Sequence, residues 1–200
     1  MHPQKNKEGN SHTNTETEVR RKIVHGLGLS VPLLYHSLGK TGFTMLVAFL
    51  LIVSITVDVL RRKKLLGEKI EEINRVFGSR WEGHIYFLLG TLIVTLLTEE
   101  GVLVAAILML TLGDGAAALI GTKFGRHKIK KNKSVEGSLA CFLACIATSM
   151  FISNFYGVDL EALLAGALVA TATETFSTRL DDNLTIPIAT GLTIQLIQNI

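Results

Sequence analysis

The feature that most constrains this chain is a succession of apolar segments separated by short polar or charged stretches. A membrane-spanning helix needs about 20 mostly apolar residues, because the hydrocarbon core of a bilayer is about 30 Å thick. Seven segments approach that length, at residues 23–39, 41–60, 84–98, 101–120, 136–156, 160–177 and 184–199. We therefore expect an all-α fold, a polytopic integral membrane helix bundle with about seven transmembrane helices.

The composition agrees with this expectation and excludes other classes. Hydrophobic residues make up 48% of the chain and charged residues only 18%, which is too apolar for a typical soluble domain. Aromatic residues are 6%, so a nucleic-acid partner bound by stacking rings is not expected. Cys141 and Cys145 have no metal-ligating neighbours, so we expect small core or lipid-facing side chains and not a disulfide or zinc site.

The two ends of the chain and one internal stretch differ from the apolar segments. Residues 1–18 are polar, and we expect a disordered cytoplasmic tail and not a signal peptide. Residues 19–200 form a single transmembrane domain in this interpretation. Within it, residues 61–83 carry apolar side chains at helical spacing between charges. That pattern predicts an amphipathic helix on the membrane surface.

The basic residues predict the orientation of the bundle. With seven spans and a cytoplasmic N-terminus, 19 of the 20 Lys and Arg residues face the cytoplasm, and Lys40 is the exception. If 84–98 and 101–120 formed one re-entrant pair, the basic loop 121–135 would move outside and the bias would be lost. We therefore favour seven spans, with an eight-span variant broken near Gly113 left open.

Polar residues in or beside the apolar segments all fall at the cytoplasmic ends in this topology. A charge at membrane depth costs about 2.5–3.5 kcal/mol on insertion scales, so each such residue needs a partner or a function. The residues concerned are His25, Asp58, Asp114, Glu136, Glu174, Asp181, Asp182 and Asn183. Their convergence on one side predicts a functional site at the cytoplasmic membrane edge.

The stretch 113–138 has the composition of an anion-binding segment. It combines glycines, six basic residues and the flanking acids Asp114 and Glu136. Glycines let backbone amides approach an anion, basic side chains neutralise phosphate, and carboxylates hold the accompanying Mg²⁺. The P-loop pattern is absent. Two structural explanations remain open, since a basic cytoplasmic loop follows from topology alone and Gly121 with Gly125 suits helix packing.

A second acidic group, Asp181-Asp182-Asn183, follows Glu174 by about two helical turns. Adjacent carboxylates repel unless a cation lies between them, which favours a metal-binding role. A capping role for Asn183 at the start of the last helix is the alternative.

Two further pairs lie at the cytoplasmic edge. His25 follows Arg21 by four residues and shares a helix face with it, and this histidine is either structural or catalytic. Asp58 precedes Arg61 and Arg62, and an ion pair that closes the second span is the simplest explanation.

Taken together, these motifs resemble the CTP-dependent polyprenol kinase family, which includes dolichol kinase, phytol kinase and CTP-dependent diacylglycerol kinase and is often labelled phosphatidate cytidylyltransferase-like. The resemblance covers residues 20–199. The motifs that carry it are Arg21-Lys22-x-x-His25, Asp58-x-x-Arg61, Gly113-Asp114-x-x-Ala117-x-x-x-Gly121-x-x-x-Gly125, Lys133-Ser134-x-Glu136-Gly137-Ser138, Glu174 and Asp181-Asp182-Asn183-Leu184-x-x-Pro187.

The resemblance implies transfer of the γ-phosphate of CTP to the hydroxyl of a membrane lipid, a polyprenol such as dolichol, with Mg²⁺. The preference for CTP comes from the family alone, and the sequence leaves the oligomeric state open. The implied nucleotide site comprises Gly115, Gly121, Lys123, Gly125, Lys133, Ser134, Glu136, Gly137 and Ser138. Asp114 with Asp181 or Asp182 are the implied metal ligands. For the base that accepts the hydroxyl proton we favour one of these carboxylates over His25.

Two other functions are compatible with parts of this pattern. A cytidylyltransferase would use the same donor and metal to make a CDP-lipid from a lipid phosphate. A small membrane transporter would need acidic groups spread through the depth of the bilayer, whereas the polar groups here gather at one face.

Overall fold

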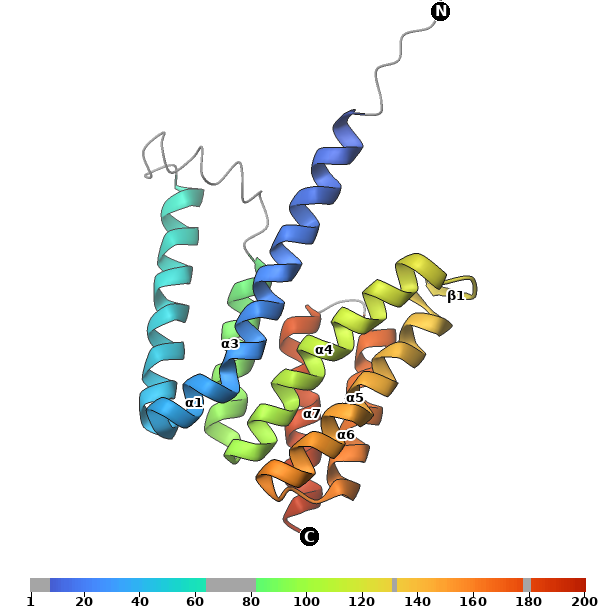
Figure 1. Cartoon of the computed structure of the whole chain (residues 1–200). Helices are drawn as coiled ribbons and strands as arrows, with labels where there is room; N and C mark the ends of the chain where they lie inside the picture. Colours follow the sequence, from blue (N-terminus) through green and yellow to red (C-terminus); the bar gives the residue numbers. More distant parts are fainter. Residues whose placement is uncertain (1–7, 64–81, 131–132, 178–180) are drawn as a thin grey trace, which may run out of the picture.

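The computed structural model describes residues 8–63, 82–130, 133–177 and 181–200, and the side chains of 8–27 and of residue 82 fall outside that description. The described chain is helical apart from one two-stranded hairpin (Figure 1). The elements are α1 (Glu8–Arg62), α3 (Glu82–Leu97), α4 (Glu100–Phe124), β1 (Lys128–Lys130), β2 (Lys133–Ser134), α5 (Val135–Tyr156), α6 (Leu160–Phe176) and α7 (Asp182–Gln198).

The first helix, α1, turns back on itself at Gly39, so that its two halves lie as separate arms in Figure 1. Gly39 has φ 65° and ψ 173°, a conformation that residues with a side chain rarely adopt. The predicted break between segments 23–39 and 41–60 is thereby confirmed. The helix begins at Glu8, so residues 8–18 are helical where we expected a disordered tail. The expected surface helix lies largely at 64–81, outside the described residues.

The other apolar segments also form helices, and each begins within two residues of its predicted start. Among the residues that the structure describes, three stretches are long and apolar enough to cross a membrane, namely Gly28–Arg62, Glu100–Phe124 and Val135–Tyr156. Gly83–Leu97 is a shorter apolar helix. These findings confirm an all-α bundle with apolar, membrane-compatible helices. The count of seven spans stays a prediction.

The core of the bundle is built around α4, which packs against α1, α5, α6 and α7. Every residue from Gly101 to Thr111 is buried, as expected for a helix enclosed by others. On its α5 side, small residues bring the two backbones together: a Cβ added at Gly137 would lie 2.8 Å from the carbonyl oxygen of Ala117. This is the close packing that glycine permits between membrane helices. Cys141 and Cys145 are free and buried here, which confirms their expected structural role.

The two ends of the bundle are built differently, and we name them by their connections. The hairpin end contains β1, β2, the end of α6 and the start of α7, which lie together in Figure 1. The turn end contains the short connections at 98–99 and 157–159, close to the C-terminal part of α7. Most of the polar residues singled out from the sequence lie at the hairpin end.

Candidate active site

A cavity of about 360 Å³ opens at the hairpin end, between α4, the hairpin, α5 and α6. On α4 the lining includes Asp114, Ala118 and Thr122, which are spaced by four residues and therefore share one helix face. The other lining residues are Ala117, Gly121, Lys128, Lys133, Ser134, Gly137, Ser138 and Glu174. Asp114, Gly121, Lys133, Ser134, Gly137, Ser138 and Glu174, which lie apart in the sequence, thus line a single cavity.

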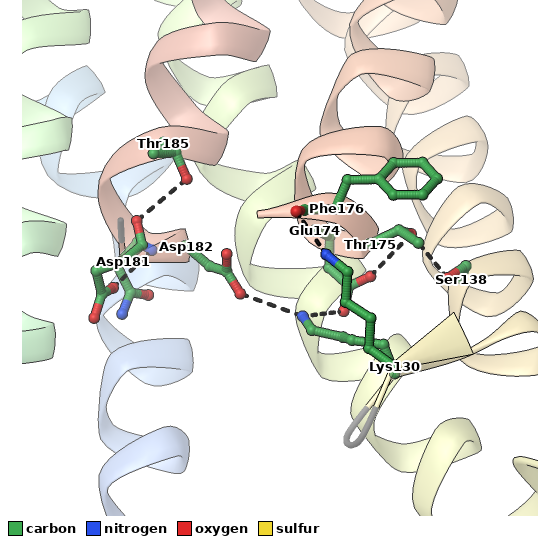
Figure 2. A network of polar contacts seen from close by, with 10 residues as sticks. Lys130, Ser138, Glu174, Thr175, Phe176, Asp181, Asp182 and Thr185 are labelled. Atoms are coloured by element: carbon green, nitrogen blue, oxygen red, sulfur yellow. Dashed lines mark hydrogen bonds and ion pairs between the residues drawn. The ribbon is translucent and has the colours of Figure 1, made fainter. Parts of the chain in front are cut away.

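Lys133 forms the charged centre of this site. Its Nζ lies 2.6 Å from Oε1 of Glu174 and 3.2 Å from Oδ2 of Asp182. Figure 2 shows the two acids facing each other from the end of α6 and the start of α7. Glu174 is only 2% exposed, so its charge depends on the ammonium for compensation.

The surroundings shift the pKa values of both Lys133 and Asp182. Burial opposes the charged form of Lys133, but the two carboxylates outweigh it and raise its pKa, so the ammonium stays protonated. Burial also raises the pKa of Asp182, which precedes the predicted span 184–199. Lys133 and a hydrogen bond from Ser177 partly offset that rise, whereas the negative charge of Asp114 adds to it.

The negative charge of Asp114 on α4 contributes to the raised pKa of Asp182 at the start of α7, although Asp182 is not among the cavity-lining residues. Protein-bound Mg²⁺ that accompanies a nucleotide usually takes one or two carboxylates and completes its coordination with phosphate oxygens and water. Asp114 and Asp182 fit that requirement. Within the described ranges, no three His, Cys, Asp or Glu side chains converge as a metal cage.

Ser138 accepts a hydrogen bond from Thr175, a residue that the sequence pattern did not single out. The hydroxyl of Thr175 donates to Oγ of Ser138 at 2.8 Å, joining α6 to α5 at the cavity wall (Figure 2). Thr175 is 4% exposed and follows Glu174 directly. A threonine inside an apolar helix gives no signal of its own, and only the packing of α5 on α6 reveals its partner.

Other motif residues shape the hairpin. Oγ of Ser134 accepts from the N–H of Gly137 at 3.2 Å, which caps α5. A Cβ added at Gly125 would lie 2.6 Å from that same Oγ, so close contact with Ser134 requires glycine here. Glu136 contacts His127, at 2.7 Å between Oε1 and Nδ1, and is not among the cavity-lining residues. The sequence motifs assign no role to His127.

Apart from those on α1, the other predicted site residues outside the cavity lining are Gly115, Lys123, Gly125, Asp181, Asp182 and Asn183. Asp181 caps α7, because its Oδ1 accepts from the N–H of Asn183 at 2.9 Å. The capping residue is therefore Asp181 and not Asn183. Lys123 is exposed at the end of α4, and Gly115 is half-buried on the same helix.

The residues predicted on α1 fall into two groups. Asp58 is ion-paired with Arg61 at 2.8 Å and with Arg62 at 2.7 Å, which confirms the expected pair. Arg21, Lys22 and His25 lie in the helical part of α1 whose side chains are outside the described residues. Helix α1 packs on α4 where Gly28 meets Thr111, one turn away from Asp114 on α4.

Comparison with known proteins gives relatives with stated activities. The chain is 29% identical over 147 residues to CTP-dependent diacylglycerol kinase 1 of Schizosaccharomyces pombe, covering 62% of this chain and 67% of that protein. It is 39% identical over 93 residues to phytol kinase of Synechocystis, covering 43% and 40%. It is 36% identical over 104 residues to farnesol kinase of Arabidopsis thaliana, covering 44% and 33%.

An uncharacterised protein of Rickettsia prowazekii matches over most of its length, at 25% identity over 187 residues, 86% of this chain and 90% of that protein. No family model and no solved structure matches. At modest identity, the named relatives confirm the resemblance to the CTP-dependent polyprenol and lipid kinase family. The aligned part is less than half of the phytol kinase of Synechocystis and of the farnesol kinase of Arabidopsis thaliana.

Proposed function

We propose that this protein is a membrane kinase that transfers the γ-phosphate of CTP to the hydroxyl of a lipid alcohol, with Mg²⁺. Relatives named as CTP-dependent diacylglycerol kinase, phytol kinase and farnesol kinase support the donor and the class of acceptor. The acceptor we favour is an isoprenoid alcohol, a polyprenol such as dolichol.

One observation carries the proposal: Asp114, Lys133 and Glu174 line one cavity, and Lys133 is also ion-paired with Asp182. Phosphoryl transfer depends on positioning and on neutralising charge more than on covalent chemistry of the protein. The protonated Lys133 and the carboxylates of Asp114 and Asp182 provide both requirements. The ammonium of Lys133 binds phosphate oxygens, and these two carboxylates hold the cation that accompanies the phosphates.

In this mechanism Asp114 and Asp182 hold Mg²⁺, which neutralises charge on the phosphates when bound. Lys133 lies against the phosphate oxygens. Gly121, Gly137 and Ser138 form the wall where the phosphates lie. The lipid hydroxyl approaches at the depth of Asp114, and a carboxylate accepts its proton. His25 is the alternative base. The contact of Gly28 with Thr111, one turn from Asp114, supports keeping this alternative.

The proposed topology has seven spans, a cytoplasmic N-terminus and the hairpin end at the cytoplasmic face. Single cysteines at positions 127 and 159 test it, because His127 contacts Glu136 at the hairpin end and Asp159 contacts Gln198 at the turn end. A membrane-impermeant thiol reagent applied to the cytoplasmic side should label position 127 and leave 159 unlabelled. Labelling of 159 alone would reverse the orientation.

Isolated membranes that contain the full chain give the direct test of activity. With γ-labelled CTP and a panel of lipid alcohols, label should pass to an alcohol, and α-labelled CTP should label no lipid. Label from α-labelled CTP in a CDP-lipid would make the protein a cytidylyltransferase instead. Lipid phosphates are supplied in parallel as alternative acceptors. If no lipid alcohol and no lipid phosphate took up label from CTP, the proposed activity would be wrong.

A matched pair of variants tests the site itself. Asp182→Asn should lower the rate by about 10²–10³-fold, the cost of removing a group that stabilises charge in the transition state. Asp181→Asn should stay near the wild-type rate, because asparagine is an equally good helix cap. Equal rates for the two variants would contradict the assignment of Asp182.

A further inference from the structure

The carboxylate of Glu136 makes its hydrogen bonds away from the cavity. Its Oε1 lies 2.7 Å from Nδ1 of His127, and the N–H of His127 donates to Oε1 at 3.2 Å and to Oε2 at 3.3 Å. Glu136 belongs to the first turn of α5, and His127 precedes β1 by one residue. The contact therefore fastens the start of the hairpin to the helix that follows it.

The hairpin needs such fastening because its strands are very short. β1 has three residues and β2 two, and they pair with an irregular register of Lys128 with Ser134 and Lys130 with Lys133. A two-stranded hairpin alone is at best marginally stable in water. The backbone contributes one closing bond beyond the strands, from the N–H of Val135 to the carbonyl oxygen of His127 at 2.9 Å.

A second attachment lies on the other side of the hairpin. Nζ of Lys130 donates to the carbonyl oxygen of Phe176 at 2.7 Å and lies 5.7 Å from the centre of its ring (Figure 2). The hairpin is thus held to α6 by Lys130 and to α5 by Glu136. Between these attachments, Lys128 and Lys133 both line the cavity.

We propose that Glu136 is a positioning residue: by binding His127 it holds the hairpin that presents Lys128 and Lys133 to the nucleotide phosphates. This inference rests on the proposed function and deepens it. It gives the glutamate of the Lys-Ser-x-Glu-Gly-Ser motif a role away from the reacting atoms. Hydrogen bonds that a carboxylate accepts are about twice as strong as neutral ones, which suits this role.

The kinetic test uses Glu136→Gln, which keeps the size of the side chain and removes its charge. The KM for CTP should rise about tenfold, the equivalent of about 1.4 kcal/mol, while kcat stays within about twofold. His127→Ala should raise the KM less, because the backbone N–H of residue 127 remains. The double variant should be no worse than Glu136→Gln alone, because both changes remove one contact. Glu161→Gln, in the exposed first turn of α6, is the matched control and should change neither constant.

A second measurement does not depend on activity. Hydrogen–deuterium exchange of the full chain in detergent, without nucleotide, should speed up at the amides of residues 127 and 135 in Glu136→Gln and stay unchanged in Glu161→Gln. Unchanged exchange at both amides, or a fall in kcat with the KM for CTP unmoved, would overturn the positioning role. If the wild type transferred no phosphate from CTP, the proposed function would fail, and the exchange result would still decide whether Glu136 holds the hairpin.

Discussion

The two ends of the helix bundle solve different problems with different chemistry. At the turn end, side-chain amides of α7 satisfy the starts of two other helices. Oε1 of Gln195 accepts from the N–H of Glu99 at 2.9 Å, and Oε1 of Gln198 accepts from the N–H of Asp159 at 2.9 Å. Lys40 also donates to the carbonyl oxygen of Thr98 at 3.1 Å. These contacts satisfy backbone groups that the helix termini leave open.

At the hairpin end, the polar contacts include a buried ion pair. Glu174 lies in the last turn of α6, and in the part of the chain that the structure describes its charge is matched by Lys133 from β2. Replacing such a pair by apolar side chains is often neutral or stabilising, so a buried ion pair is weak evidence of a role in stability. The comparison indicates that the side-chain contacts of the turn end stabilise the helix bundle. The buried ion pair of the hairpin end is not explained by stability alone.

Lys133→Met should have the largest effect, because it removes the positive charge from the cavity and leaves Glu174 without its ion pair. We expect transfer from CTP to fall by at least about 10²-fold. Lys130→Met, on the same hairpin but bonded to a backbone carbonyl, should lose less than about tenfold. Rates measured in membranes at matched expression give both values. Similar losses in the two variants would mean that the whole hairpin, and not Lys133, matters.

Gly137→Ala should come next, because its Cβ would press on Ala117 and separate α4 from α5 beside the cavity. Overpacking of this kind costs about 1–3 kcal/mol, and both thermal stability and activity should fall. Ala147→Ser, at an exposed position of the same helix, is the control. Thermal unfolding in detergent and the transfer rate measure the two effects. Lost stability with full activity would show that the cavity does not depend on this contact.

The pH dependence should report on Asp182. Its carboxylate binds a cation only when ionised, and because burial raises its pKa, activity should decline on acidification at a higher pH than for an ordinary aspartate. Ser177 lowers that pKa through a hydrogen bond, so Ser177→Ala should move the acidic limb of kcat/KM further toward high pH. A pH profile of both proteins checks the direction. A shift toward low pH would contradict the assignment of Asp182.

Changes at the turn end should have the smallest effect on activity. Gln195→Ala and Gln198→Ala each leave one backbone N–H without its acceptor, and each should lower the free energy of unfolding by about 0.5–1.5 kcal/mol. The kcat should stay within about twofold of wild type. Thermal unfolding and the transfer assay measure both quantities. A large loss of kcat here would remove the contrast between the two ends.

Much of the fold followed from local patterns. Apolar length predicted the helices, and the start of each helix after α1 came within two residues, because burial and helix length are local properties of a sequence. The break at Gly39 agreed with the boundary set by apolar content. The prediction of a disordered tail was wrong over residues 8–18, which are helical. Polar composition predicts that a segment forms no core, but it says little about whether a neighbouring helix extends into that segment.

The sequence singled out most residues of the candidate site and only part of their contacts. Asp114, Lys133, Glu174 and Asp182 were chosen for their charge, and the structure gathers them. Thr175 was missed because a buried hydroxyl resembles any other polar residue in an apolar helix. His127 was missed because its link to Glu136 needs the hairpin to bring the two together.

By itself, the sequence determined that this is a membrane-compatible helix bundle, and it singled out the charged residues of the candidate site. Spacing and composition act over one element at a time, and they suffice for that conclusion. The tertiary structure alone decided which charges meet between elements: Lys133 with Glu174 and Asp182, and Glu136 with His127. The partners of Lys133 lie 41 and 49 positions from it in the sequence, and the packing of the hairpin against α6 and α7 sets their distances.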